Sequence, residues 1–157
     1  MAGSESIVAG SQFAAGTADA YGQYRSGKFN ARIHRMNAEI AEMQARDAAR
    51  RGESAVAAAR GEGKRVLAAQ RASYAGQGVA VDQDVAAVVA SDTERAIEQD
   101  VDLIRANAIR EAWGHRVQAV DSRARASVER YESNNRASGT ILTSGIESYR
   151  TYRNLKA

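Results

Sequence analysis

The absence of proline constrains this chain more than any other feature. None of its 157 residues is proline, so no position lacks a backbone donor or carries the fixed φ angle that stops a helix. Alanine supplies much of the 44% apolar fraction, while aromatic residues make up only 6%. Because alanine favours helix and hides little surface, we expect long helices that bury narrow stripes against one another.

Glycines provide the places where such helices can end. Gly76 and Gly78 supply the positive φ angle that a helix end and a chain reversal require. Asp82 is then placed as the N-cap of a second helix. A rival start is the capping box from Ser91 to Glu94, which would leave a longer loop. These signals predict helices near residues 29–75 and 83–133, joined by a turn near 76–82.

Large apolar residues recur along both predicted helices with the spacing of a coiled-coil seam. In the first helix the stripe steps by four and three residues through Phe29, Ile33, Met36, Ile40 and Met43. In the second helix it passes through Val85, Val89, Ile97, Val101, Ile104 and Ala108, and then Ile109, Trp113, Val117, Val120, Ala124, Val128 and Tyr131. We interpret these stripes as the surfaces that join the two helices.

The distribution of charge favours an antiparallel arrangement. Reversal near residue 79 would place residue i roughly opposite residue 158 minus i. Basic residues of the first helix would then face acidic residues of the second: Arg60, Lys64, Arg65 and Arg71 against Asp84, Asp92, Glu94, Glu98 and Asp100. Exposed pairs of this kind contribute only ~0.2 to 1 kcal/mol each, so they select the orientation more than they stabilise it. The predicted fold is an all-α, coiled-coil-like helical hairpin.

The hairpin is predicted to occupy residues 28–135, with glycine-rich segments at 1–27 and 136–157. Each glycine in these segments weakens a helix by about 1 kcal/mol relative to alanine. They are either flexible tails or segments that become ordered on a membrane or on a neighbouring subunit. The chain has no run of ~18 apolar residues and its start lacks the features of a secretory signal, so we expect synthesis in a cytoplasm.

We expect the hairpin to form a ring-like homo-oligomer, because one hairpin buries a single stripe on each helix. The residues expected at packing and oligomer contacts are Phe29, Ile33, Met36, Ile40, Ile104, Ile109, Trp113 and Val117. Trp113 is the single tryptophan of the chain. We interpret it as an anchor in a helix or subunit interface, with a role at a membrane surface as the alternative.

Basic residues gather at the end of the predicted hairpin opposite the turn. The set comprises Arg25, Lys28, Arg32, Arg35, Arg123, Arg125 and Arg130, with Arg150, Arg153 and Lys156 nearby in the C-terminal segment. In a ring these charges would recur in every subunit and could contact DNA phosphates without reading sequence. The alternative is a solvated helix end without a ligand.

The sequence offers little material for catalysis. It contains no cysteine and two histidines, His34 and His115. It has no zinc-protease, nucleophile-elbow, phosphate-loop or dinucleotide motif. Carboxylate pairs such as Glu39 with Glu42 are explained by exposed positions on a long helix. We therefore expect no enzymatic activity, no metal and no cofactor.

Three stretches resemble the internal virion proteins, or DNA-ejection proteins, of short-tailed phages (podoviruses). They are residues 36–53 (MNAEIAEMQARDAARRGE), 71–81 (RASYAGQGVAV) and 104–120 (IRANAIREAWGHRVQAV). The resemblance implies a protein packaged near the portal, expelled with the genome and assembled in the host envelope into part of a DNA conduit. Its partners would then be copies of itself, the portal or other ejection proteins, DNA and the host envelope membrane.

Two functions remain open at this point. The chain is either an internal core or ejection component that oligomerises and helps to form the conduit, or a structural virion connector, adaptor or scaffold that never crosses an envelope. Both place the protein in the virion after synthesis in the host cytoplasm.

Overall fold

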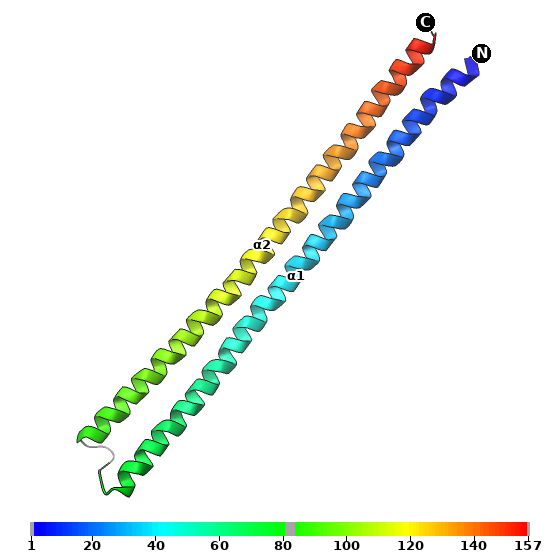
Figure 1. The fold of residues 1–157 in the computed structure, drawn as a ribbon. Coiled ribbons are helices and arrows are strands. Elements are labelled where there is room, and N and C mark those ends of the chain that lie inside the picture. The colour runs from blue at the N-terminus through cyan, green and yellow to red at the C-terminus, as the bar shows by residue number, and fades with distance from the viewer. Residues whose placement is uncertain (1, 81–83, 157) are drawn as a thin grey trace. The chain divides into compact units, whose positions relative to one another are not determined.

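A computed structural model describes residues 2–80 and 84–156 as two long helices packed as a hairpin (Figure 1). Helix α1 spans Ala2–Gly76 and helix α2 spans Asp84–Lys156, with lengths of 75 and 73 residues. The described residues contain no strand. The all-α hairpin predicted from the proline-free, alanine-rich sequence is confirmed.

Both helices are longer than the sequence analysis predicts. Helix α1 continues towards the N-terminus as far as Ala2, and helix α2 continues past Tyr131 to Lys156. Glycine lowers intrinsic helix propensity, but packing against a second helix outweighs that preference. Gly16 lies against Ser144 and Gly27 lies against Ser133. These glycines allow the two backbones to approach each other, so they accompany the helix rather than end it.

A Schellman motif ends α1 at the predicted turn. The N–H group of Val79 donates to the carbonyl oxygen of Tyr74 at 3.0 Å, and the N–H group of Gly78 donates to that of Ala75 at 3.1 Å. Gly78 has a φ angle of 75°, in the left-handed region that this motif requires. Gly78 thus has the predicted positive φ angle, whereas that prediction is wrong for Gly76, which is helical and is the last residue of α1. Asp82 lies outside the described residues, and the rival start at Ser91 is wrong because α2 begins at Asp84.

The chain divides into two compact units that each contain a piece of both helices. We call Met1–Ile40 with Ala119–Ala157 the terminal unit, and Ala41–Gln118 the turn unit. Within each unit the two helix pieces pack antiparallel: Gly52 lies against Ala108 in the turn unit, and Gly27 lies against Ser133 in the terminal unit.

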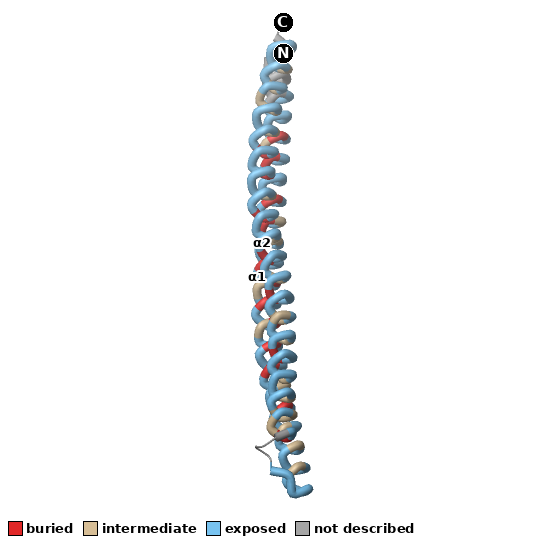
Figure 2. Tube along the Cα trace, turned by 90° about the vertical axis from the view of Figure 1, so that its left-hand side faces the viewer, coloured by how far each residue is buried: buried red, intermediate tan, exposed pale blue. Residues whose placement is uncertain are grey.

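Alanine and glycine recur along the seam of the turn unit. Buried and half-buried residues step by four, three and four, repeating every eleven residues: Ala41, Ala45, Ala48, Gly52, Val56, Ala59, Gly63, Leu67, Gln70 and Tyr74 on α1. The same steps occur on α2 at Ala86, Ala90, Thr93, Ile97, Val101, Ile104, Ala108, Ala112, His115 and Ala119, the last of which borders the unit. Figure 2 shows such buried positions recurring along the helices. Eleven residues in three turns correspond to about 3.67 residues per turn, close to the 3.6 residues per turn of an α-helix. The seam residues of each helix therefore keep facing the other helix over many turns.

The same register holds within each unit. In the turn unit Gly52 lies against Ala108 and Gly63 against Ile97, and in the terminal unit Gly16 lies against Ser144 and Gly27 against Ser133. Residue i therefore faces residue 160 minus i, two residues away from the predicted 158. Of the predicted cross-helix ion pairs, Arg60 with Glu98 forms at 3.2 Å, whereas Arg65 pairs with Glu62 on its own helix.

The predicted seam is wrong for most of its large apolar residues. Ile97, Val101, Ile104 and Ala108 are buried or half-buried in the turn unit, as expected. The other large residues are exposed, except for half-buried Val89: Phe29, Ile33, Met36, Ile40, Met43, Val85, Ile109, Trp113, Val117, Val120, Val128 and Tyr131. Two helices approach more closely through alanine and glycine than through large side chains, and the alanine stripe therefore occupies the seam.

Candidate functional site

The first candidate surface is an apolar stripe on α1 in the terminal unit. It consists of Phe29, Ile33, Met36 and Ile40, which we call the α1 stripe; their exposed fractions are 63%, 40%, 53% and 45%. Each member lies two residues after a seam residue, as Ile33 follows Ala31 and Ile40 follows Ala38. Two residues correspond to about 200° of rotation around a helix. The α1 stripe therefore points away from α2.

A second set of large apolar residues lies exposed on α2. Ile109, Trp113 and Val117 belong to the turn unit, with exposed fractions of 68%, 65% and 46%. Val120, Val128 and Tyr131, which belong to the terminal unit, are also exposed. Ile104 differs from the other residues predicted at oligomer contacts because it lies half-buried in the seam of the turn unit.

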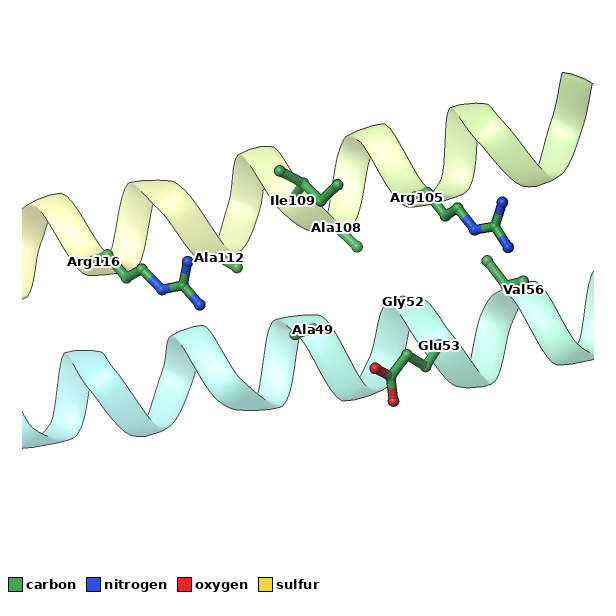
Figure 3. Close-up of a pocket in the computed structure, with 9 residues that line it drawn as sticks. All are labelled: Ala49, Gly52, Glu53, Val56, Arg105, Ala108, Ile109, Ala112 and Arg116. Carbon is green, nitrogen blue, oxygen red and sulfur yellow. The ribbon is translucent and has the colours of Figure 1, made fainter.

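A shallow hollow of about 330 Å³ opens between the helices of the turn unit (Figure 3). Small residues form much of its lining because Gly52 and Ala108 bring the helices together. Figure 3 shows side chains of Arg105, Ile109 and Arg116 on α2 and of Glu53 on α1 around it. The lining includes no serine, threonine, cysteine or histidine. This hollow is suited to receiving an apolar side chain with polar groups at its rim.

The third candidate surface is a basic groove in the terminal unit. Arg35 and Glu39 of α1 line it together with Arg123, Ser127 and Arg130 of α2. Arg130 also lines an adjoining hollow with Tyr24, Lys28, Ser133 and Asn134. The two hollows share Arg130, so Lys28, Arg35, Arg123 and Arg130 are brought together; we call these four residues the basic groove.

The remaining predicted basic residues do not line the groove. Arg125 forms an ion pair with Asp121 on its own helix at 2.9 Å. Arg25 lies 5.7 Å from the ring centre of Tyr21, and Lys28 within the groove lies 5.6 Å from that of Tyr24. Arg32 is exposed on α1 beside the α1 stripe. Of the seven predicted basic residues, four line the basic groove and three, Arg25, Arg32 and Arg125, lie outside it.

The positive charge of the chain belongs to the terminal unit. That unit contains eleven Lys and Arg residues against seven Asp and Glu residues, a net charge of +4. The turn unit contains eleven against twelve, a net charge of −1, which together give the overall +3. The basic groove therefore lies in the only part of the chain with an excess of cations.

The part of the chain that the structure describes offers neither a metal site nor a membrane-spanning helix. No group of three or more His, Cys, Asp or Glu side chains there is arranged to hold a metal ion. None of the described helical segments is long and apolar enough to cross a membrane. His34 and His115 are half-buried at seam positions.

The structure reveals one set of residues that the sequence analysis missed, the small residues of the seam. Their signal is present in the sequence as the eleven-residue spacing of Ala41, Gly52 and Gly63. Searches against protein-family models, curated proteins and solved structures find no match to the chain.

Proposed function

We propose that the chain is a non-enzymatic structural subunit that assembles with copies of itself inside a phage particle, as an internal core or ejection component. One observation supports assembly above all. In the described residues the buried apolar core consists of alanines and two valines, Val56 and Val101, whereas 26 large apolar residues are exposed. The seam of the hairpin therefore contains many small side chains, and most of the large apolar side chains point outwards.

The energetic cost of this arrangement favours association. Burial of a large apolar side chain stabilises a structure by about 1.5–3 kcal/mol relative to leaving it in water. The α1 stripe, together with Ile109 and Trp113, offers several such residues on outward sides of the helices. A contiguous exposed apolar surface such as the α1 stripe marks an interaction site in soluble proteins. A second copy of the chain is the partner that is always present where the protein is made.

The phage role follows from the resemblance of residues 36–53, 71–81 and 104–120 to internal virion proteins. The most distinctive of these stretches contains Tyr74, Gly76 and Gly78, which form the helix end and its Schellman motif. In this role the subunit would help to form the conduit that carries DNA into the host, next to the portal or other ejection proteins. The basic groove would contact the phosphates of DNA packed in the particle or passing through the conduit.

Two measurements test the proposal. Light scattering of the purified chain over a range of concentrations should show a defined homo-oligomer, and a monomer at every concentration would contradict self-assembly. Mass spectrometry of purified phage particles, before and after release of their DNA, should find the chain in full particles and not in emptied ones. Retention in emptied particles would favour the structural connector, and binding to liposomes of host lipids would separate the two roles further.

A further inference from the structure

We infer that the α1 stripe joins two copies of this chain in an antiparallel pair. The α1 stripe steps by four, three and four residues, which is the spacing of d and a positions in a heptad repeat. Phe29 and Met36 occupy d positions, and Ile33 and Ile40 occupy a positions. On the other side of α1 in the same unit, the seam with α2 passes through Gly27, Ala31, His34 and Ala38, each two residues before a member of the α1 stripe. The α1 stripe is thus a separate coiled-coil surface, and this inference names the contact through which the proposed assembly forms.

The charges beside the α1 stripe select the second copy as its occupant. Arg32 and Glu39 occupy the successive g positions next to Ile33 and Ile40. Both are exposed. Glu39 also lines the basic groove beside Arg35, but neither Arg32 nor Glu39 forms an ion pair with another described residue. In an antiparallel coiled coil, g positions of one helix face g positions of the other. Arg32 of each copy then faces Glu39 of the other, so two unpaired charges of opposite sign meet twice.

One register satisfies both the apolar and the charged residues. Pairing Ile33 with Met36 of the other copy also pairs Phe29 with Ile40, and the two-fold symmetry repeats each layer. Sliding the helices by one heptad in one direction places Glu39 opposite Glu39. Sliding them in the other direction places Arg32 opposite Arg32; Arg25 then faces Glu39, but Met36 and Ile40 face Ser26 and Gly22 and lose their apolar partners. A parallel pair places the g positions opposite Asn37 and Gln44, which carry no charge. The apolar residues and the charges together therefore favour the antiparallel pair in a single register.

The contact is limited in length. The next g positions outwards are Arg25 and Arg46, which would face each other with like charge. The favourable region thus covers about two heptads, centred between Ile33 and Met36.

A rival occupant of the α1 stripe is the exposed apolar surface of α2 on another copy, around Val120 and Val128. That surface lacks the heptad spacing of the α1 stripe, since its residues at 120, 124, 128 and 131 step by four, four and three.

The first test reverses the charges one at a time in the full chain. Arg32→Glu alone sets glutamate against Glu39 twice, and Glu39→Arg alone sets arginine against Arg32 twice. Each variant should dimerise about ten-fold more weakly or worse than the unchanged chain. An equimolar mixture of the two variants restores both attractive pairs, and it should form a heterodimer of near-original affinity. A general loss of folding would not be rescued by mixing.

The second test determines orientation with cysteines, for which the natural chain has no competing thiol. Phe29→Cys and Ile40→Cys chains should form a disulfide-linked heterodimer when they are mixed under mild oxidation. Phe29→Cys alone should not cross-link, because the two copies of residue 29 would lie eleven residues apart along the helices, about 16 Å, beyond the reach of a disulfide. Cross-linking of Phe29→Cys with itself would indicate a parallel pair and overturn the inference.

The outcomes separate this inference from the proposed function on which it rests. An unchanged chain that remains monomeric at every concentration contradicts self-assembly itself. An oligomer that is unaffected by both charge reversals, but is lost on Val128→Glu, shows assembly through α2 and overturns only the role of the α1 stripe.

Discussion

Gly52 lies so close to Ala108 on the facing helix that a Cβ atom added to Gly52 would overlap the Ala108 methyl group. The methyl group cannot rotate away, so only separation of the helices would make room. Gly52→Ala should therefore lower the free energy of unfolding by about 1–3 kcal/mol, the usual cost of overpacking. Thermal or urea unfolding followed by circular dichroism measures the change.

Gly61 supplies the matched control for this substitution. It lies nine residues further along the same helix, and a Cβ atom added there meets nothing within 4 Å. Gly61→Ala should raise the free energy of unfolding by up to about 1 kcal/mol, because alanine favours helix over glycine. Equal effects of the two substitutions would mean that close approach at Gly52 does not hold the turn unit together.

Gly78 should resist substitution for a different reason. Its φ angle of 75° lies in the left-handed region, where other L-residues pay about 1–2 kcal/mol. Gly78→Ala should destabilise the hairpin by about this amount, whereas Gly76→Ala should be neutral or stabilising because Gly76 is helical with open space around it. Urea unfolding of the two variants measures the difference. Equal stability would remove the need for a left-handed residue at this helix end.

Trp113 provides a probe of assembly. With 65% of its surface exposed, Trp113→Ala should change the unfolding free energy of dilute chain by less than about 0.5 kcal/mol. If Trp113 is covered by another subunit, its fluorescence should shift to the blue as concentration rises, and Trp113→Ala should weaken the oligomer. The signal comes from one residue because the chain has a single tryptophan. A spectrum independent of concentration in a solution that does contain oligomers would place this ring outside the subunit contact.

The basic groove should bind DNA through phosphates. Binding of the assembled protein to duplexes of unrelated sequence should be equal, and its logarithm should fall linearly with that of the salt concentration. Lys28→Gln, Arg35→Gln and Arg130→Gln should each reduce this slope by about one unit where the residue contacts a phosphate. Arg125→Gln is the control, since Arg125 pairs with Asp121 outside the groove. An equal loss on Arg125→Gln would indicate a diffuse effect of net charge.

The fold class and the turn could be predicted because they depend on local chemistry. A proline-free, alanine-rich sequence favours helix at nearly every position, and Gly78 is required by backbone geometry alone. The partner of each apolar stripe could not be predicted in the same way. Periodicity shows that Phe29 and Ile33 share a side of α1, but it does not show whether that side contacts α2 or another molecule. The competing stripe through Ala41 and Gly52 lies in the seam because small residues allow closer helix approach.

The candidate sites show the same distinction. Helical spacing alone separates Arg123 from Arg125, since two residues correspond to about 200° of rotation, and Asp121 stands one turn before Arg125. The sequence could therefore have predicted that Arg125 lies outside the groove. Bringing Arg130 between Lys28 and Arg35 depends on the register of the helices, which differs by two residues from the prediction. Residues two positions apart lie on nearly opposite sides of a helix. The register between α1 and α2 therefore decides which cations of the two helices lie close together.

The eleven-residue repeat of the turn unit has a consequence for how such a protein can change over evolution. Ala41, Gly52 and Gly63 occupy equivalent positions on α1, and Ala86, Ile97 and Ala108 occupy equivalent positions on α2. Insertion or deletion of eleven residues in each helix, at facing positions, would leave every remaining seam residue on its inward side. Insertion of any number of residues that is not close to a multiple of the 3.6 residues in a helical turn would rotate one part of the seam into solvent. Homologous hairpins can therefore differ in length by this increment while they keep the same turn and the same contacts at both ends.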